Sequence, residues 1–255
     1  MTKCDKCHSL AIIYQRYSGM HLCREHFEED VHRKIRGGLR KTGFFGHGAR
    51  IAVGLDGGQK SAALAFVLKN LFICRRDIDL LAVIIDEGKK TSPTADQARH
   101  VAEQLNLPYI VKSLPLLPNL KSPCPVHTTW KRELFFCAAE ENGAGILATG
   151  ETLDDEALEI FIGCLRGDVD AVVSEHKVPW IKPLRRIPEK EVQLYAIGHD
   201  LGFADAGEMP NALYREAKRL LRGFDSRHPG TNYSLLRGLE KSPKHDGANK
   251  GKAFK

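Results

Sequence analysis

A strand, a glycine turn and a helix in close succession constrain this chain more than any other feature. Residues 51–55 form an apolar run, residues 56–61 read Asp-Gly-Gly-Gln-Lys-Ser, and residues 62–68 favour a helix. Such a turn leaves backbone N–H groups at a helix N-terminus, where the helix dipole favours phosphate. The spacing is not that of a Walker A loop, and a glycine pair alone is also compatible with a βα turn that binds nothing.

Apolar segments alternate with helical segments along most of the chain. Strands are expected at residues 51–55, 80–85, 109–111 and 145–149, and helices at residues 61–70, 93–105, 129–142 and 154–165. This order predicts an α/β fold with a doubly wound parallel sheet. Ligands of such sheets bind beyond the carboxyl ends of the strands. Polar loops at residues 56–61, 86–88 and 150–155 should meet there, which indicates a nucleotide site.

Four metal-type ligands lie near the N-terminus in two close pairs, Cys4 with Cys7 and Cys23 with His26. This spacing favours a closed tetrahedral zinc site, although unrelated thiols are the alternative. About thirty residues cannot bury a core of their own, so zinc would supply the folding energy. With four protein ligands, no coordination position remains for catalysis.

Length and composition favour one α/β core with a small appended module. The chain has 255 residues, 42% of them apolar, and no apolar run approaches the roughly 20 residues that span a bilayer. The polar N-terminus does not resemble a signal peptide. We therefore expect a cytoplasmic protein with no membrane contact. Seven cysteines, an odd number, indicate reduced thiols rather than a disulfide framework.

Positive charge is unevenly spread. The net charge is +6, and residues 237–255 contribute +4 of it. Further basic residues lie at positions 32–41 and on the helices expected between residues 188 and 239; the latter are Arg215, Lys218, Arg219, Arg222, Arg227 and Arg237. Such surfaces suit a polyanion such as RNA, and solvated basic faces are the alternative.

These patterns divide the chain into five segments. They are a zinc-binding finger in residues 1–30, a basic linker helix in 31–48, a nucleotide-binding domain in 49–187, a helical region in 188–239, and a disordered basic tail in 240–255.

The order of the motifs resembles a known family, the PP-loop ATP pyrophosphatases that thiolate tRNA uridines, and in particular the TtuA-like 2-thiouridine branch. The motifs are the finger, the glycine turn, Ile85-Asp86-Glu87-Gly88, Ala148-Thr149-Gly150, Leu153-Asp154-Asp155-Glu156, Leu165-Arg166-Gly167-Asp168 and Lys182-Pro183-Leu184. The resemblance runs from about residue 3 to residue 240. It implies the PP-loop fold of adenine nucleotide α-hydrolases.

The resemblance implies a reaction in two steps. ATP with Mg²⁺ adenylates a uridine carbonyl oxygen of tRNA and releases pyrophosphate, and sulfur then attacks the same carbon with loss of AMP. It also implies tRNA, a sulfur-carrier protein and a second copy of the chain as partners.

Site residues follow from the same resemblance. The residues implied in nucleotide binding are Gly54, Asp56, Gly57, Gly58, Lys60, Ser61, Asp86 and Gly150. Those implied in catalysis are Cys124, Lys131, Asp154 and Asp155. Arg132 would lie beside Lys131 near the ATP and the target base. Two adjacent carboxylates at a helix start suit Mg²⁺, but an N-cap followed by acidic first-turn residues gives the same pattern.

The turn departs from the family pattern, which is Ser-Gly-Gly-x-Asp-Ser. Asp56 places a carboxylate where a neutral hydroxyl would bind phosphate, and Lys60 reverses the sign of an acidic position. Lys60 can offset Asp56 by pairing with it or with phosphate. Glu151 stands where the family usually has His.

The cluster positions depart further. Relatives hold a 4Fe–4S cluster with three cysteines, whereas this chain has Cys124, His127 and Met209 at the corresponding positions. Because a thioether is a poor substitute for a thiolate, these residues argue against a cluster. The remaining thiols, Cys74, Cys137 and Cys164, are expected in the core.

Three functions remain open. The first is tRNA thiolation without a cluster, with sulfur from Cys124 or a protein thiocarboxylate, by an enzyme that the altered turn impairs or leaves active. The second is a non-catalytic paralogue that binds nucleotide, tRNA or a partner. The third is an adenylating enzyme with another substrate.

Overall fold

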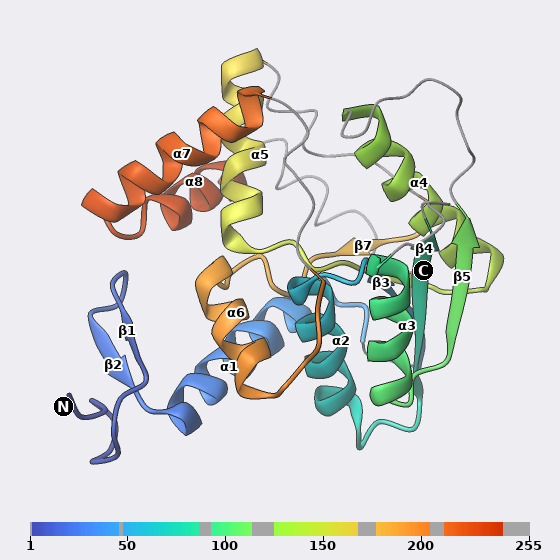
Figure 1. Ribbon diagram of the computed structural model, residues 1–255, viewed down its shortest axis with the longest axis horizontal. Helices are drawn as coiled ribbons and strands as arrows, with labels where there is room; N and C mark the ends of the chain where they lie inside the picture. Colours follow the sequence, from blue (N-terminus) through green and yellow to red (C-terminus); the bar gives the residue numbers. More distant parts are fainter. Residues whose placement is uncertain are drawn as a thin grey trace.

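The computed structural model describes residues 2–45, 48–86, 93–113, 125–167, 177–204 and 212–241 (Figure 1). Of residues 93 and 125–130 it describes the backbone alone. No helix in these ranges is long and apolar enough to cross a lipid bilayer.

A five-stranded parallel sheet forms the centre of the molecule. Its strands are β3 (Ala49–Leu55), β4 (Ile78–Asp86), β5 (Tyr109–Ser113), β6 (Ile146–Ala148) and β7 (Trp180–Ile181), in the order β5-β4-β3-β6-β7. The order reverses at β3, as in a doubly wound sheet, so the predicted fold class is confirmed. The sequence did not predict β7, because a two-residue strand has no readable periodicity.

Helices cover both faces of the sheet. Those on one face are α2 (Gln59–Phe72) and α3 (Pro93–Gln104), with α1 (Arg24–Thr42) and α6 (Glu189–Gly198) packed into the same core, and α4 (Pro125–Glu141) covers the other face. Alternate residues of β3 pack into the two cores on opposite faces of the sheet. Ile51 and Val53 pack with α2, whereas Ala52 lies between them on the face of Phe135 and Phe136.

The N-terminal finger is a short antiparallel hairpin followed directly by a helix. Strands β1 (Ile13–Gln15) and β2 (Met20–Leu22) pair, and α1 begins at Arg24, next to the ligand Cys23. Residues 31–42 of the expected linker 31–48 are therefore the later part of a longer helix, which ends at Thr42. Its buried residues Phe27, Val31, Ile35 and Leu39 recur every four positions and join the main core. The helix is thus a packed element of the main domain.

Three helices stand together away from the sheet (Figure 1). They are α5 (Leu153–Arg166), α7 (Ala212–Arg227) and α8 (Thr231–Glu240). Ala217 and Leu221 of α7 pack on α5, and α8 packs on the same helix through Leu236. Helix α8 ends at Glu240, whose carboxylate accepts two 2.7 Å hydrogen bonds from Arg186. The predicted disordered tail beyond residue 241 lies outside the described residues.

A buried polar cluster, which we call the Gln15 network, joins the finger to the main domain. Its members are Gln15, Tyr17, Asp30, Lys34 and Glu191. The Gln15 amide donates to both Asp30 and Glu191 at 3.1 Å, and the Tyr17 hydroxyl donates to Glu191 at 2.8 Å. Lys34 lies 2.8 Å from Asp30 and 3.4 Å from Glu191. Side chains from the hairpin, α1 and α6 therefore satisfy one another away from water.

Candidate functional site

The glycine turn lies between β3 and α2 at the carboxyl edge of the sheet. Gly57 has a φ of +77°, and a Cβ at this position would lie 2.0 Å from the carbonyl oxygen of Thr94. Only glycine fits, because the backbone is left-handed and α3 approaches closely. The N-cap residue of α2 is Gly58, which has no side chain of its own to cap the helix. The helix therefore presents its N-terminal end to the site, as an anion site requires.

Asp56 folds back onto this turn. Its Oδ1 accepts the Gly58 N–H at 2.9 Å and the Ser61 hydroxyl. Crowding by protein atoms acts to raise the pKa of the Asp56 carboxyl, but the charge of Lys131 and these hydrogen bonds outweigh it, so the pKa is lowered. Asp56 is thus a carboxylate held inside the turn.

Lys60 pairs with Asp155 rather than with Asp56. Its ammonium donates to both carboxylate oxygens of Asp155, at 2.9 and 2.8 Å. Desolvation opposes both charges, yet the pair lowers the pKa of Asp155 and raises that of Lys60. Pairing with Asp56 was one of the two roles expected for Lys60, and its ammonium instead donates to Asp155 of α5.

Asp154 and Asp155 point in different directions. Asp155 forms a capping box with Thr152 at the start of α5. Asp154 instead accepts the Glu189 N–H at 2.6 Å and the Asn232 amide at 3.3 Å, so it faces α6 and α8. Burial, and the nearby charge of Glu189, raise the pKa of Asp154. The two carboxylates do not form the shared magnesium-binding face that the sequence suggested.

The remaining predicted nucleotide residues lie along the same edge. A Cβ on Gly150 would lie 3.1 Å from the backbone of Lys60 and Ser61, so the loop after β6 packs on the start of α2. Gly54 is similarly close to Phe135 and Thr149. Asp86 ends β4 and lies 3.4 Å from Arg99. The edge therefore gathers every predicted nucleotide residue.

A cationic and aromatic group lies beside the turn. Arg132 and Lys182 lie over the Trp180 ring, at 4.8 and 4.1 Å from its centroid, and the Trp180 indole N–H donates to Thr149. Lys182 also donates to the buried carboxylate of Glu156. Sequence reasoning noted the motifs that contain Lys182 and Glu156, although not this contact between them, and it missed Trp180. Trp180 lies on β7, which is separated by β6 from the strand that precedes the turn, and this short strand was not predicted.

The predicted cluster positions cannot be placed. Cys124 and Met209 lie outside the described residues, as does the side chain of His127. Three other thiols, Cys74, Cys137 and Cys164, were expected in the core, and all are exposed. Cys137 and Cys164 lie at solvent-facing positions of α4 and α5. The expectation was wrong because it followed from their apolar neighbours in the sequence.

The finger brings its four expected ligands together. The ligand atoms of Cys4, Cys7, Cys23 and His26 all lie within 4.8 Å of one another, and they form the one such group in the described parts of the chain. The Sγ atoms of Cys7 and Cys23 are 3.7 Å apart, close to the edge of about 3.8 Å in a tetrahedron with zinc–sulfur bonds of about 2.3 Å.

One thiol of the finger, that of Cys4, is also prepared as a ligand. The pKa of Cys23 is instead raised, because a backbone hydrogen bond at His26 is outweighed by burial and by the thiols of Cys7 and Cys4. Desolvation opposes ionisation of Cys4, but backbone hydrogen bonds at Cys23, Lys6 and Cys7 lower the pKa of its thiol to about 6. His26 Nδ1 lies 3.6 Å from Cys4 Sγ and 3.3 Å from Cys23 Sγ. Donor type and spacing both fit a single tetrahedral metal ion.

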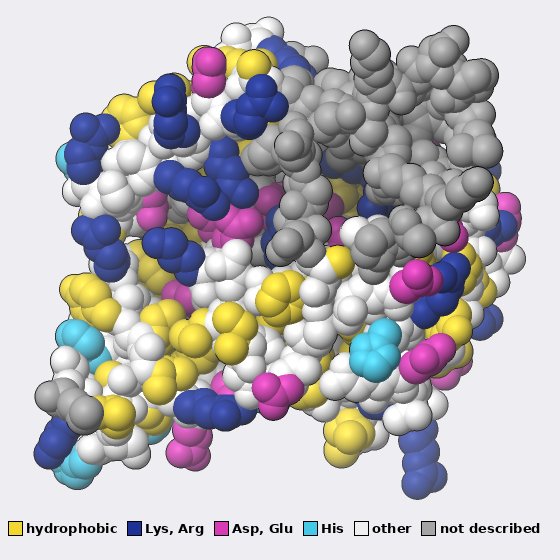
Figure 2. Space-filling view, viewed as in Figure 1, with side chains coloured by type: hydrophobic (Ala, Val, Ile, Leu, Met, Phe, Trp, Pro, Cys, Tyr) yellow, Lys and Arg dark blue, Asp and Glu magenta, His cyan; other side chains and the backbone are white. Residues whose placement is uncertain are grey.

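Basic side chains gather over α7 (Figure 2). Arg215, Lys218, Arg219, Arg222 and Arg227 lie on this helix. Lys218 and Arg222 pair with Glu189 at 3.3 and 3.1 Å. Arg215 and Arg219 are exposed, and no hydrogen bond or ion pair holds either within the described chain. The helix therefore offers an outward positive surface, which we call the α7 face.

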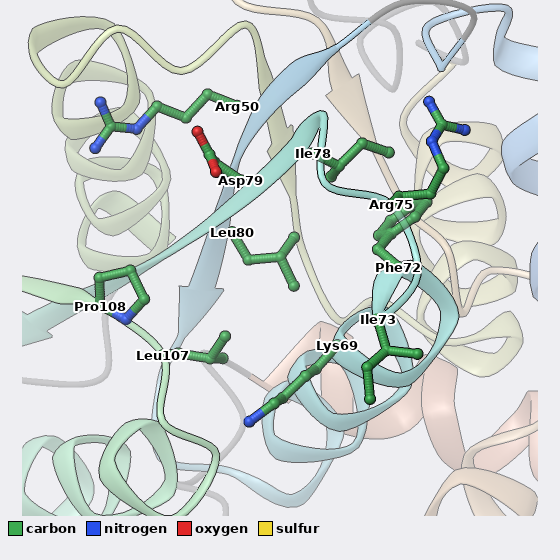
Figure 3. A pocket seen from close by; sticks show the side chains of 10 residues that line it. All are labelled: Arg50, Lys69, Phe72, Ile73, Arg75, Ile78, Asp79, Leu80, Leu107 and Pro108. Atoms are coloured by element: carbon green, nitrogen blue, oxygen red, sulfur yellow. The ribbon is translucent and has the colours of Figure 1, made fainter.

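A cavity of about 390 Å³ lies at the opposite end of the sheet (Figure 3). It is lined by the amino-terminal ends of β3 and β4 and the end of α2, including Arg50, Lys69, Asp79 and Leu107. Arg75, at its rim, pairs with Asp77. None of the predicted site residues lines it, so we assign it no part in the site.

Known proteins match this chain in its overall fold and in its N-terminal finger. NH3-dependent NAD synthetase from Campylobacter jejuni has the same architecture, with a TM-score of 0.50, 13% identity, and coverage of 90% of this chain and 98% of that one. Residues 3–28 match the family model of the N-terminal LIM domain of 2-thiouridine synthetase TtuA.

Two further proteins match almost the whole chain. The tRNA 2-thiolation protein NcsA of Haloferax volcanii is 31% identical over 93% of this chain and 86% of that protein. The structure of U34-tRNA thiolase NcsA from Methanococcus maripaludis has a TM-score of 0.86 and 26% identity, covering 96% of this chain and 89% of that one. The chain belongs to the TtuA/NcsA family of tRNA 2-thiolation proteins.

One expectation about cofactors is overturned by this comparison. The residues Cys124, His127 and Met209 argued against a 4Fe–4S cluster. The Methanococcus maripaludis NcsA structure was solved with its 4Fe–4S cluster. The expectation is therefore wrong, and it rested on three positions whose side chains lie outside the described part of the chain.

Proposed function

We propose that this chain thiolates a uridine of tRNA after activating it with Mg·ATP. The observation that carries the proposal is the convergence of the glycine turn, Lys131 and the start of α5 on the carboxyl edge of the sheet, in a chain of the tRNA 2-thiolation family. Curated relatives act on tRNA by name, and tRNA is the substrate class proposed here.

The turn would hold the phosphates of ATP. The N-terminal end of α2 supplies backbone N–H groups, and Lys60 and Lys131 supply positive charge. Asp155 fixes the position of Lys60, so it would position that charge. Asp86, at the end of β4, would lie near the adenosine. Cys124 remains the candidate sulfur-carrying thiol.

The α7 face would bind the tRNA backbone. Its exposed Arg215 and Arg219 suit phosphate, which needs no base-specific contact for affinity. We also propose a sulfur-carrier protein and a second copy of the chain as partners, and action in the cytoplasm.

Two metal centres enter the proposal. The finger would hold zinc through Cys4, Cys7, Cys23 and His26, as a structural site. A 4Fe–4S cluster is a further expected cofactor on the strength of the NcsA structure. Iron, zinc and acid-labile sulfide analysis of anaerobically purified protein tests both at once.

The direct test is formation of 2-thiouridine in an unmodified tRNA transcript with Mg·ATP and sulfide, read by mass spectrometry of nucleosides. We expect product from the wild type and a loss of at least about tenfold in Lys131→Ala, because a charge beside the phosphates is removed. Arg50→Ala, at the far end of the sheet, is the matched control. Absence of product, with cluster and zinc both present, would refute the proposal.

A non-catalytic, tRNA-binding paralogue is the second candidate. The position of Asp56 inside the turn favours it, since a carboxylate there opposes phosphate. This candidate predicts tRNA binding without ATP turnover.

A further inference from the structure

The Asp56 carboxylate occupies hydrogen-bond donors that face the phosphate site. It accepts the backbone N–H of Gly58 at 2.9 Å and the hydroxyl of Ser61. Both groups belong to the glycine turn, where a phosphate oxygen would be the expected acceptor. We infer that Asp56 is an internal anion of the turn, which competes with the phosphates of a nucleotide for the same donors.

The position of Asp56 follows from the turn itself. Asp56 is the first residue after β3, and its side chain reaches two residues forward to Gly58, in the manner of an Asx turn. A Cβ at Gly58 would lie 3.1 Å from Asp56 Oδ1, so the carboxylate lies close against the backbone of the turn. The backbone therefore holds the carboxylate over the start of α2 without help from a ligand.

The cations around the turn are already engaged. Lys131 lowers the pKa of the Asp56 carboxyl, so its charge is directed partly at that residue. Lys60 donates to both oxygens of Asp155. A bound nucleotide would therefore compete with Asp56 for its hydrogen-bond donors and would be repelled by its negative charge. The two nearby cations would offset this repulsion only in part, because each already interacts with a carboxylate.

The consequence is a turn that binds the phosphates of a nucleotide more weakly than it would with a neutral side chain at position 56. A neutral side chain at this position would remove the charge, and a hydroxyl would also free the donors. The inference rests on the proposed role of the turn in nucleotide binding. It makes no demand on tRNA or on sulfur, so binding of ATP alone tests it independently of thiolation.

The experiment is calorimetric titration of the zinc-loaded full chain with Mg·ATP. Asp56→Asn removes the charge and keeps an acceptor of the same length, whereas Asp56→Ser removes the charge and leaves a shorter hydroxyl that can also donate. We expect about tenfold tighter binding in Asp56→Asn than in the wild type, and tighter binding still in Asp56→Ser. Asp79→Asn is the matched control, because it removes one exposed carboxylate at the opposite end of the sheet (Figure 3) and should leave affinity unchanged.

Thermal unfolding of each variant accompanies the titrations. Wild-type affinity equal to that of both Asp56 variants would overturn the inference, as would absence of ATP binding in all of them. Loss of the fold in both variants would also overturn it, because Asp56 would then be a structural residue of the turn.

Discussion

At the scale of single residues, two neighbouring carboxylates hold different parts of the molecule. Asp155 caps α5 through Thr152 and holds Lys60 beside the turn. Asp154 binds the start of α6 and the amide of Asn232. The pair therefore fixes α5 against the turn on one side and against the C-terminal helices on the other.

Asp155→Ala should lower the free energy of unfolding by about 2 kcal/mol, since a cap is lost and Lys60 is left without its partner. The carboxyl pKa is lowered in the fold from a usual value of 3.8. Its contribution is therefore complete above about pH 4 and is lost as the pH falls through the lower folded pKa. Urea denaturation at pH 7 and pH 3 measures this; a difference from wild type that persists undiminished at pH 3 would contradict it. Asp79→Ala is the control.

Sequence reasoning found these residues but not their partners. The Thr152 cap is readable, because an N-cap followed by an acid three residues on is a local pattern. The contact between Lys60 and Asp155 joins positions 95 apart in the chain, and no local pattern encodes it. Asp56 was expected to oppose phosphate through its charge, but no local sequence pattern showed its hydrogen bonds to Gly58 and Ser61.

At the scale of elements, α7 shows how one helix serves packing and a surface at once. Ala217 and Leu221 bury one face against α5. Arg215 and Arg219, four residues apart, lie together on an exposed face. Helix α5 thus packs against α7 and contacts Lys60 of the turn through Asp155.

Arg215→Ala with Arg219→Ala should weaken tRNA binding and reduce the slope of log affinity against log salt by about 1 to 2, because each phosphate contact releases about one counterion. Filter binding across a salt series measures both. The matched control is Arg50→Ala with Arg76→Ala, which removes the same charge from exposed positions away from α7. Equal slopes in the two double variants would contradict a tRNA-binding α7 face.

Long elements with strong periodicity were predictable, and short or basic ones were not. The four helices expected around the turn begin and end within a few residues of α2, α3, α4 and α5. Helix α1 was read as a basic linker because its charges outnumber its apolar residues, yet Phe27, Val31, Ile35 and Leu39 form a buried stripe. Charge near the surface concealed that stripe.

At the scale of the whole molecule, the finger is interlocked with the main domain. Gln15 lies on β1, between the two ligand pairs, and its amide is buried against Asp30 and Glu191. Helix α6 carries Glu191 and, at its start, the N–H that binds Asp154. A continuous set of contacts therefore runs from the metal ligands to α5.

Gln15→Leu should lower the stability of the main domain by about 1–3 kcal/mol, because two buried carboxylates lose a donor. Removal of the metal by a chelator should also destabilise the main domain of the wild type. The effect should be smaller in Gln15→Leu, since the contacts that join the finger to the main domain are already weakened in this variant. Hydrogen exchange of α6 measures both effects. Gln193→Leu, at an exposed position of α6, is the control. Unchanged exchange in α6 after metal removal would contradict the interlock.

The most direct test of the central claim is tRNA-dependent release of pyrophosphate from Mg·ATP by the purified chain. The first step forms the adenylated uridine and releases pyrophosphate, so this assay requires no sulfur donor. We expect pyrophosphate release that requires tRNA, falls at least about tenfold in Lys131→Ala, and is unchanged in Arg50→Ala. Release that is absent, or equal with and without tRNA, would contradict the assignment of ATP-dependent tRNA chemistry to this edge of the sheet.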